Sequence, residues 1–339
     1  QVDDDETTLF QLKNNSIAYN EDYERQLARN ALELTLSKKI ITSNGHLFNL
    51  ALANRSDSYW YSSNNFSPNT EKEKVWARNI PEFHAKWRYP LVRDIFGAVT
   101  AKIEPIATAF IGKNYNKDFE KFALIDISKY ELSEYNLFSP NKFSGIDYHD
   151  YGKRFSYGIN GSLLFEQYYL DVFLGQLIYQ NNINAKGNKD YVGSSSIDIA
   201  NNLKLYYRFR KDKKLNPIRD EVGVTTNSKK LTTTLSFSKL NNISKYYSDD
   251  GLVFPENKVS QISLSVGYQI FETLKVDTGT QFDITKKTRL LNRSIQVTYI
   301  MDCVSITGRF YDNFTHDKSR GIKKNSSKTF AIGLKVLNM

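Results

Sequence analysis

The residue types that most often carry chemistry are sparse in this chain of 339 residues. The four histidines are His46, His84, His149 and His316. No two of them have the spacing of a metal-binding pair, and the densest polar tract, "GIDYHDYGKR" at 145–154, brings together only Asp147, His149 and Asp150. A metal or catalytic site is one interpretation of this tract, but a polar loop that folds over the mouth of a barrel explains it better.

Nucleophilic catalysis lacks its usual sequence signals. The chain has no GxSxG turn. A catalytic serine also needs a positioned base, and no histidine or aspartate can be assigned to that role from the sequence. A glycine-rich phosphate loop is missing as well. We therefore expect no enzyme, no metal and no cofactor.

Composition excludes several further classes. The net charge is +9, yet Lys and Arg are spread along the chain, whereas a nucleic-acid surface concentrates them on one element. The single cysteine, Cys303, excludes a disulfide framework within the chain. No apolar run reaches the length of about eighteen residues that predicts a membrane-spanning helix. The acidic opening "QVDDDETTLF" has no apolar signal-peptide core, so we expect a mature form or a fragment.

The elements that would position any site read as strands, because apolar and polar residues alternate with period two almost throughout. Even "EDYERQLARNALELTLSKK", which begins like a helix, alternates from Leu32 onward. The clearest runs lie at 82–89, 99–111, 197–210, 231–237, 262–270, 274–284, 291–301, 304–314 and 330–336. We count about fourteen strands, and most are longer than the usual 5–6 residues of globular proteins.

Strand length and connection length both favour a membrane barrel. Transmembrane strands need about 9–11 residues, and outer-membrane barrels alternate short turns with longer outside loops. The connections mostly follow that alternation, except that 212–229 should be short and 286–289 should be long. The sequence therefore predicts an all-β, antiparallel transmembrane β-barrel whose apolar face meets lipid and whose polar face lines the lumen. A soluble β-sandwich or solenoid is the alternative.

Aromatic residues near strand ends suit the girdles of such a barrel, although ordinary strand aromatics would look the same. They are Trp60, Tyr61, Trp87, Tyr89, Tyr168, Tyr169 and Tyr311.

Several tracts, in this order and spacing, resemble the C-terminal barrel of the LPS-assembly protein LptD family in its alphaproteobacterial style. The tracts are "WRYPLV" (87–92), "AKIEPIATAFIG" (101–112), "YNLFSPNKFSGIDYHDYGKRFSYGIN" (135–160), "VTYIMDCVSITGRFYDNFT" (297–315) and "FAIGLKVL" (330–337). The most specific is the "NLFSPNKFSGID" loop, followed by the Asp-Cys turn. The resemblance covers 80–339 well and 20–80 loosely.

The resemblance implies the function of an outer-membrane translocon that inserts lipopolysaccharide into the outer leaflet through a lateral opening of the barrel. It implies these partners: lipopolysaccharide, an LptE-like plug lipoprotein, a periplasmic LPS-bridge protein, the barrel-assembly machinery and membrane lipid. The family's periplasmic jellyroll domain is not recognisable here. Residues 1–339 are therefore expected to be one C-terminal barrel domain from a longer protein.

The resemblance also gives roles to two segments. Cys303 matches a family cysteine that forms a disulfide with the N-terminal domain, so its partner would lie outside this chain. The alternative is an unpaired thiol at a turn. The closing strand, 329–337, matches one side of the lateral opening. It comprises Thr329, Phe330, Ala331, Ile332, Gly333, Leu334, Lys335, Val336 and Leu337, of which Thr329, Ala331, Gly333 and Lys335 would face inward.

Five lumen cations are candidates for attracting phosphate groups, since cations suit anionic ligands, although the general charge of a wet lumen explains each single residue better. They are Lys204, Arg208, Arg210, Lys275 and Lys335. Two rival functions share most of these features. The first is a diffusion porin or another outer-membrane barrel, and the second is a soluble all-β binding or adhesion protein.

Overall fold

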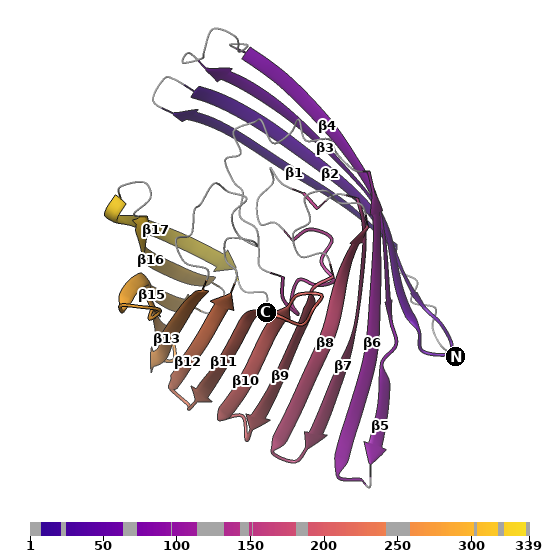
Figure 1. The fold of residues 1–339 in the computed structure, drawn as a ribbon, viewed down its shortest axis with the longest axis vertical. Helices are drawn as coiled ribbons and strands as arrows, with labels where there is room; N and C mark the ends of the chain where they lie inside the picture. The colour runs from indigo at the N-terminus through magenta and orange to yellow at the C-terminus, as the bar shows by residue number, and fades with distance from the viewer. Residues whose placement is uncertain are drawn as a thin grey trace. The chain divides into compact units, whose positions relative to one another are not determined.

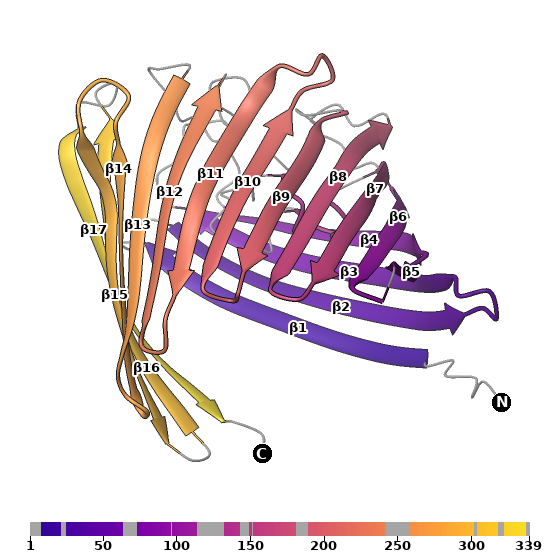
Figure 2. The ribbon, with the colours of Figure 1, turned by 90° about the horizontal axis from the view of Figure 1, so that it is seen from below.

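A computed structural model describes most of the chain, and Figures 1 and 2 show it from two directions. The described residues are 8–21, 25–63, 73–95, 97–113, 132–142, 149–150, 152–180, 189–241, 258–301, 304–317 and 322–336. Within these ranges the regular structure consists entirely of strands. The described residues form no helix that is long and apolar enough to cross a membrane.

The described residues form seventeen strands. Their bounds are β1 Thr8–Glu21, β2 Arg25–Ile41, β3 Leu47–Ser63, β4 Glu73–Arg88, β5 Leu91–Ile95, β6 Val99–Gly112, β7 Lys153–Phe165, β8 Tyr168–Gln180, β9 Tyr191–Ile199, β10 Leu203–Lys211, β11 Pro217–Asn227, β12 Leu231–Asn241, β13 Lys258–Phe271, β14 Leu274–Asp283, β15 Arg289–Met301, β16 Val304–Asp317 and β17 Ile322–Val336. The predicted all-β class is confirmed, and most strands have the predicted length. The tract that begins like a helix lies in β1 and β2.

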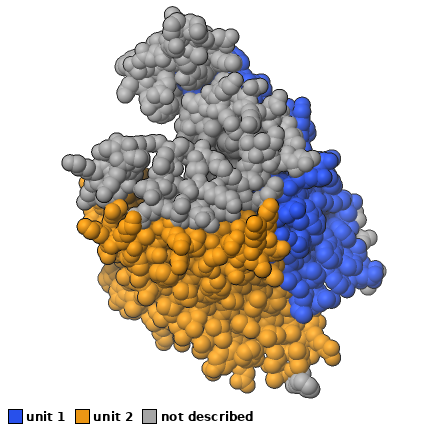
Figure 3. Space-filling model, viewed as in Figure 1, with its two compact units in different colours: residues 1–91, 103–159, 175–189 blue, residues 92–102, 160–174, 190–339 orange. Residues whose placement is uncertain are grey.

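The chain divides into two compact units, which Figure 3 colours separately. Unit 1 comprises 1–91, 103–159 and 175–189, and unit 2 comprises 92–102, 160–174 and 190–339. In unit 1, β1, β2, β3 and β4 pair in order, and β4 then pairs with β6. In unit 2, β9 to β17 pair in order. Every one of these pairs is antiparallel, as predicted.

β5 is a continuation of β4 rather than a separate pass of the chain. The two strands are separated only by Tyr89 and Pro90, and the amide of Tyr89 donates to the carbonyl of Pro105 in β6 at 3.1 Å. Proline has no amide hydrogen for a strand ladder, so Pro90 accounts for the interruption. The seventeen described strands therefore make sixteen passes.

Two predictions about strand bounds were wrong. The run at 197–210 is two strands, because φ is positive at Ala200 and Asn201 and the amide of Asn202 donates to the carbonyl of Ile199 at 3.0 Å. This is the geometry of a type I′ hairpin turn. The connection 212–229 contains β11, so the true turns there are 212–216 and 228–230. With β11 and the turn at 200–202 in place, 228–230 is short as the alternation requires, but 212–216 stands where a long connection is expected and is itself short.

The two faces of the strands differ as predicted. We call the face with exposed apolar side chains the outer face and the opposite one the inner face. On β17, for example, Phe330, Ile332 and Leu334 are 69–73% exposed on the outer face. The buried side chains of the inner face include many charged ones. Soluble monomers rarely expose such a wide apolar band, so this pattern argues against the soluble alternative.

Candidate functional site

Glu82 is the centre of a buried polar network on the inner face of unit 1. It lies in β4, and its side chain is 3% exposed. Arg154 Nη2 in β7 donates to its Oε1 at 2.5 Å, and His149 Nε2 lies 3.1 Å from its Oε2. His84, two residues along the same strand face, places Nε2 3.1 Å from Oε1. A buried carboxylate is stable only when it is paired in this way.

Arg154 joins that network to the connection between β6 and β7. Its side chain is fully buried. Besides Glu82, the guanidinium donates to the carbonyl oxygens of Asp150 and of Pro140, the latter at 2.7 Å. Its Cζ also lies 4.9 Å from the ring centroid of Phe110, a cation–π contact. Arg154 thus attaches two points of the connection, at Pro140 and Asp150, to the strands.

The described part of that connection, 132–142, is folded tightly. Ser133 and Asn136 form a local turn, in which the Ser133 amide donates to Asn136 Oδ1 at 2.9 Å. Leu137, at the end of this turn, has no exposed surface, and its carbonyl accepts a bond of 3.0 Å from Ser156 Oγ in β7. The described part of the tract that was most specific in the sequence, 136–142, therefore packs against the inner face. The loop interpretation of 145–154 agrees with the positions of His149 and Asp150, whereas Asp147 lies outside the described residues.

Asp150 closes the connection at its other end. Its Oδ2 accepts the amide of Lys142 at 3.0 Å and lies 3.6 Å from Lys142 Nζ. Its Oδ1 accepts the Tyr179 hydroxyl of β8 at 3.1 Å. Burial lowers the pKa of Lys142 below its ordinary value, and the charge of Asp150 opposes that shift. Lys142 is thus held in the network at an electrostatic cost.

A second buried carboxylate, Asp57 of β3, lies nearby on the same face. Arg55 Nε donates to its Oδ1 at 2.8 Å, and Arg78 Nε in β4 donates to its Oδ2. Arg78 also donates to the Tyr59 hydroxyl at 3.3 Å. Neither Asp57 nor Arg78 has exposed side-chain surface.

These two networks hold segments in place and show no arrangement for a reaction. Each carboxylate is occupied by arginine or histidine. No group of three or more metal-ligating side chains among the described residues is arranged to hold an ion. The contacts of Glu82, Arg154 and Asp150 attach the described parts of the 132–150 connection to β4, β7 and β8, whereas the Asp57 network joins β3 to β4.

All five predicted lumen cations lie in unit 2, and the four on the inner face of β10 or β14 are each close to a carboxylate. Lys204 Nζ is 3.2 Å from Asp198, Arg208 Nη1 is 3.8 Å from Glu221, Arg210 Nη2 is 2.7 Å from Asp190, and Lys275 Nζ is 2.8 Å from Asp277. Only Arg210 is buried. The structure does not bring the four into one cluster with a common ligand position, so phosphate attraction stays a prediction.

The predicted gate strand corresponds to the end of β17. Its bounds differ, since β17 begins at Ile322, and Leu337 lies outside the described residues. The register pairs Thr329 with Tyr311 and Lys335 with Ser305 of β16. Lys335 thus shares the inner face with Ser305, as predicted. Cys303 lies outside the described residues, so its disulfide also stays a prediction.

The sequence did not identify Glu82, Arg154 or Asp57 as functional residues. Glu82 and His84 were visible only as two polar members of an alternating strand. The sequence offered one usable signal, the clustering of charged residues at 147–154 directly before a strand.

The model of the family LptD, LPS transport system D, matches residues 3–274. The family match covers the tracts at 87–92, 101–112 and 135–160 but does not reach those at 297–315 and 330–337. The LPS-assembly protein LptD of Aliivibrio fischeri is 23% identical over 207 residues, which are 57% of this chain and 26% of that protein. The chain thus spans about a quarter of that relative's length.

Among solved structures, two mutants of the Rhodopseudomonas blastica porin are similar. A five-substitution mutant is 12% identical and a triple mutant 11%, both with a TM-score of 0.44, and each alignment covers 96% of this chain and 99% of the porin. At these values the likeness does not decide function. The family match is different in kind, since it extends over most of the chain. The chain therefore belongs to the LptD family, the LPS transport system D proteins.

Proposed function

We propose that this chain forms part of the wall of a barrel that delivers lipopolysaccharide to the outer leaflet of the outer membrane. The observation that carries the proposal is the family match over residues 3–274. The family makes the protein an outer-membrane β-barrel protein, and the exposed apolar outer face of the strands is what such a setting requires. The polar inner face offers a wet path for the sugar part of an amphiphile.

In the proposed mechanism the lipid leaves through a lateral opening bordered by β17. Opening a seam between strands breaks backbone hydrogen bonds, which is costly beside lipid, so one side should be a terminal strand. β17 pairs with β16 and corresponds to the strand that borders the opening in the family that the chain resembles. The small residues Ala331 and Gly333 on its inner face leave room for a passing headgroup. The plug lipoprotein, the periplasmic bridge and the assembly machinery belong to the same proposal.

Depletion of the full-length protein in the source bacterium tests the transport role. We expect newly labelled lipopolysaccharide to accumulate at the inner membrane and to stop reaching antibody at the surface of intact cells. Surface delivery at the normal rate after depletion would refute transport and leave a porin-like barrel. A steady open pore in the purified protein would favour that same alternative.

A photocrosslinking amino acid in the full-length protein tests the position of the opening. Phe330 on β17 and Phe237 on β12 are both exposed on the outer face, at 69% and 40%. We expect a crosslink to lipopolysaccharide from position 330 that exceeds the crosslink from position 237. Equal crosslinking at the two positions would contradict an opening at β17 without affecting the transport role.

A further inference from the structure

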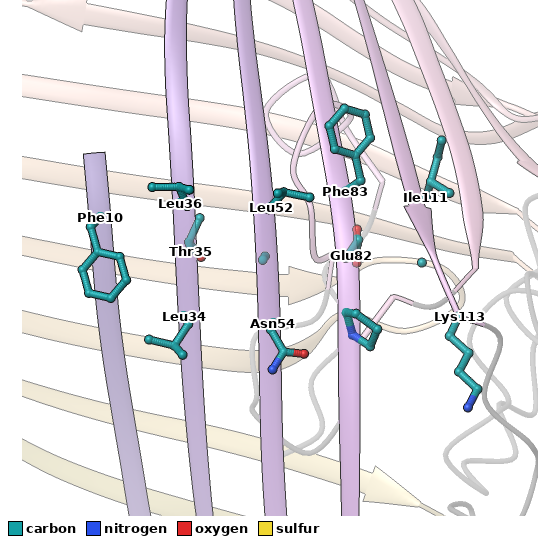
Figure 4. Close-up of a pocket in the computed structure, with 13 residues that line it drawn as sticks. Phe10, Leu34, Thr35, Leu36, Leu52, Asn54, Glu82, Phe83, Ile111 and Lys113 are labelled. Carbon is teal, nitrogen blue, oxygen red and sulfur yellow. The ribbon is translucent and has the colours of Figure 1, made fainter. Parts of the chain in front are cut away.

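A shallow apolar groove runs across the outer face of β1, β2, β3, β4 and β6, all within unit 1 (Figure 4). One cross-strand row forms its wall, because the register places Phe10 beside Leu36, Leu36 beside Leu52, Leu52 beside Phe83 and Phe83 beside Ile111. The next row is less bulky on β3 and β4, where Asn54 lies beside Pro81. The groove exists because this second row carries a short amide and a proline ring where the first carries leucine and phenylalanine.

The wall of the groove is open to the surroundings of the barrel. Phe10 is 66% exposed, Leu52 is 61% exposed and Ile111 is 50% exposed. In an outer-membrane protein this face meets acyl chains, and a furrow between apolar side chains offers a chain more contact than a flat strand surface does. The groove therefore suits one extended hydrocarbon chain.

The groove lies where the apolar band of these strands ends. Beyond it, towards the connections 22–24 and 64–72, most outer-face side chains are polar and some bond to one another, and one apolar row with Trp60 and Val75 follows nearer the connections. Asn30 Nδ2 donates to Ser16 Oγ at 2.7 Å, and Ser56 Oγ donates to Asn79 Oδ1 at 3.1 Å. Such a change from apolar to polar residues along a barrel strand marks the edge of the hydrocarbon layer. The groove thus reaches the depth of lipid headgroups.

Two nitrogen groups lie at this polar end of the groove. The amide nitrogen of Asn54 points towards the same end as the side chain of Lys113 (Figure 4). An amide donor suits an ester or phosphate oxygen, and an ammonium group suits a phosphate charge. The groove therefore combines an apolar channel with a cationic, hydrogen-bond-donating end.

We propose that this groove is a binding site for one acyl chain of an anionic, phosphate-bearing membrane lipid. Its headgroup would contact Asn54 Nδ2 and the ammonium of Lys113. The proposal uses the placement of the protein in a membrane and does not use its transport activity. It assigns the outer face of β1–β4 and β6 a specific lipid, whereas the outer face of unit 2 would meet lipid without selection.

Lipid retention by the purified full-length protein tests the proposal. The protein is equilibrated in micelles with equal amounts of dioleoylphosphatidylglycerol and dioleoylphosphatidylcholine, and retained lipid is counted by native mass spectrometry. We expect the anionic lipid to be preferred. Asn54→Phe fills the groove and should reduce that lipid about tenfold, as expected when a buried chain loses its cavity. Lys113→Gln should reduce it about threefold, as expected for one exposed charge.

Two matched variants serve as controls. Thr278→Phe adds the same ring to an exposed outer-face position of β14, and Lys287→Gln removes an exposed lysine of the 284–288 connection. Both should retain lipid like the unmodified protein. A heat-induced shift on electrophoresis confirms that each variant is folded. Equal retention of the two lipids, or equal retention by Asn54→Phe and Thr278→Phe, overturns the proposal. Surface delivery of lipopolysaccharide is measured separately, so failure of this site is distinguishable from failure of the proposed function.

Discussion

Glu82→Gln is the substitution that tests most directly how the 132–150 connection is held. It keeps the size of the side chain but removes the charge that faces Arg154 and the two histidines. Breaking a buried ion pair costs about 3–5 kcal/mol, because the remaining charge is buried without compensation. Arg154 keeps the carbonyl oxygens of Asp150 and Pro140 as acceptors. We therefore expect the lower end of that range, about 3 kcal/mol.

Two measurements on the full-length protein in micelles report this loss. Urea unfolding followed by tryptophan fluorescence should show a lower midpoint with an unchanged slope. Trypsin should also cleave faster after Lys142, a buried lysine within the connection. A loss of about 3 kcal/mol corresponds to a population of the opened connection that is about 100-fold higher.

Glu33→Gln is the matched control for this experiment. It also removes one carboxylate on the inner face of unit 1. The ion pair that it breaks joins Lys13 Nζ to Glu33 Oε1 at 3.8 Å, and both side chains are exposed. Exposed pairs contribute about 1 kcal/mol or less. If Glu82→Gln and Glu33→Gln shift the urea midpoint equally, or if cleavage after Lys142 stays the same, then Glu82 does not hold the connection.

Three further predictions concern single residues. Burial lowers the pKa of Lys142 below 10.5. The unfolded chain therefore binds more protons than the folded protein in the pH range just below that value, so the free energy of unfolding rises with pH there. Lys142→Met should flatten this rise in urea titrations at several pH values, and the same dependence on pH in both proteins would contradict it. Gly193→Ala should lower stability by about 1–3 kcal/mol, since a Cβ at Gly193 would lie 2.5 Å from the Phe209 ring. Gly161→Ala is the control, because a Cβ there would meet no atom within 4 Å. Equal melting temperatures of the two variants would count against this prediction. In the native full-length protein Cys303 should resist maleimide until a reductant is added, and free reactivity would refute its disulfide.

The sequence predicted the parts of the fold that depend on local alternation. Each strand carries its own signal, since outer-face residues such as Leu32 and Leu34 alternate with inner-face ones such as Glu33. One error came where a turn preserves the alternation. Ile199 and Leu203 have the same parity across the turn at 200–202, so two strands looked like one. A short turn that lacks Gly and Pro leaves no visible break in a period-two pattern.

The buried networks were not predictable in the same way. Glu82 lies 67 residues from His149 and 72 from Arg154 along the chain. The register of several intervening strands and the fold of one long connection decide whether these groups meet. No spacing rule connects residues across such a distance, whereas a helix or hairpin motif brings its residues together locally. The sequence could therefore mark polar positions as inward but could not identify their partners.

The pairing of the predicted lumen cations bears on the proposed transport. Lys204, Arg208, Arg210 and Lys275 each lie close to a carboxylate, so a phosphate group would have to compete with that carboxylate for the cation. Passage through a pore requires binding that is weak enough for the substrate to leave. Unpaired arginines would bind a phosphorylated sugar tightly and retain it. We infer that a wall of paired charges keeps the path polar without trapping an anionic headgroup, which is what delivery to the outer leaflet needs.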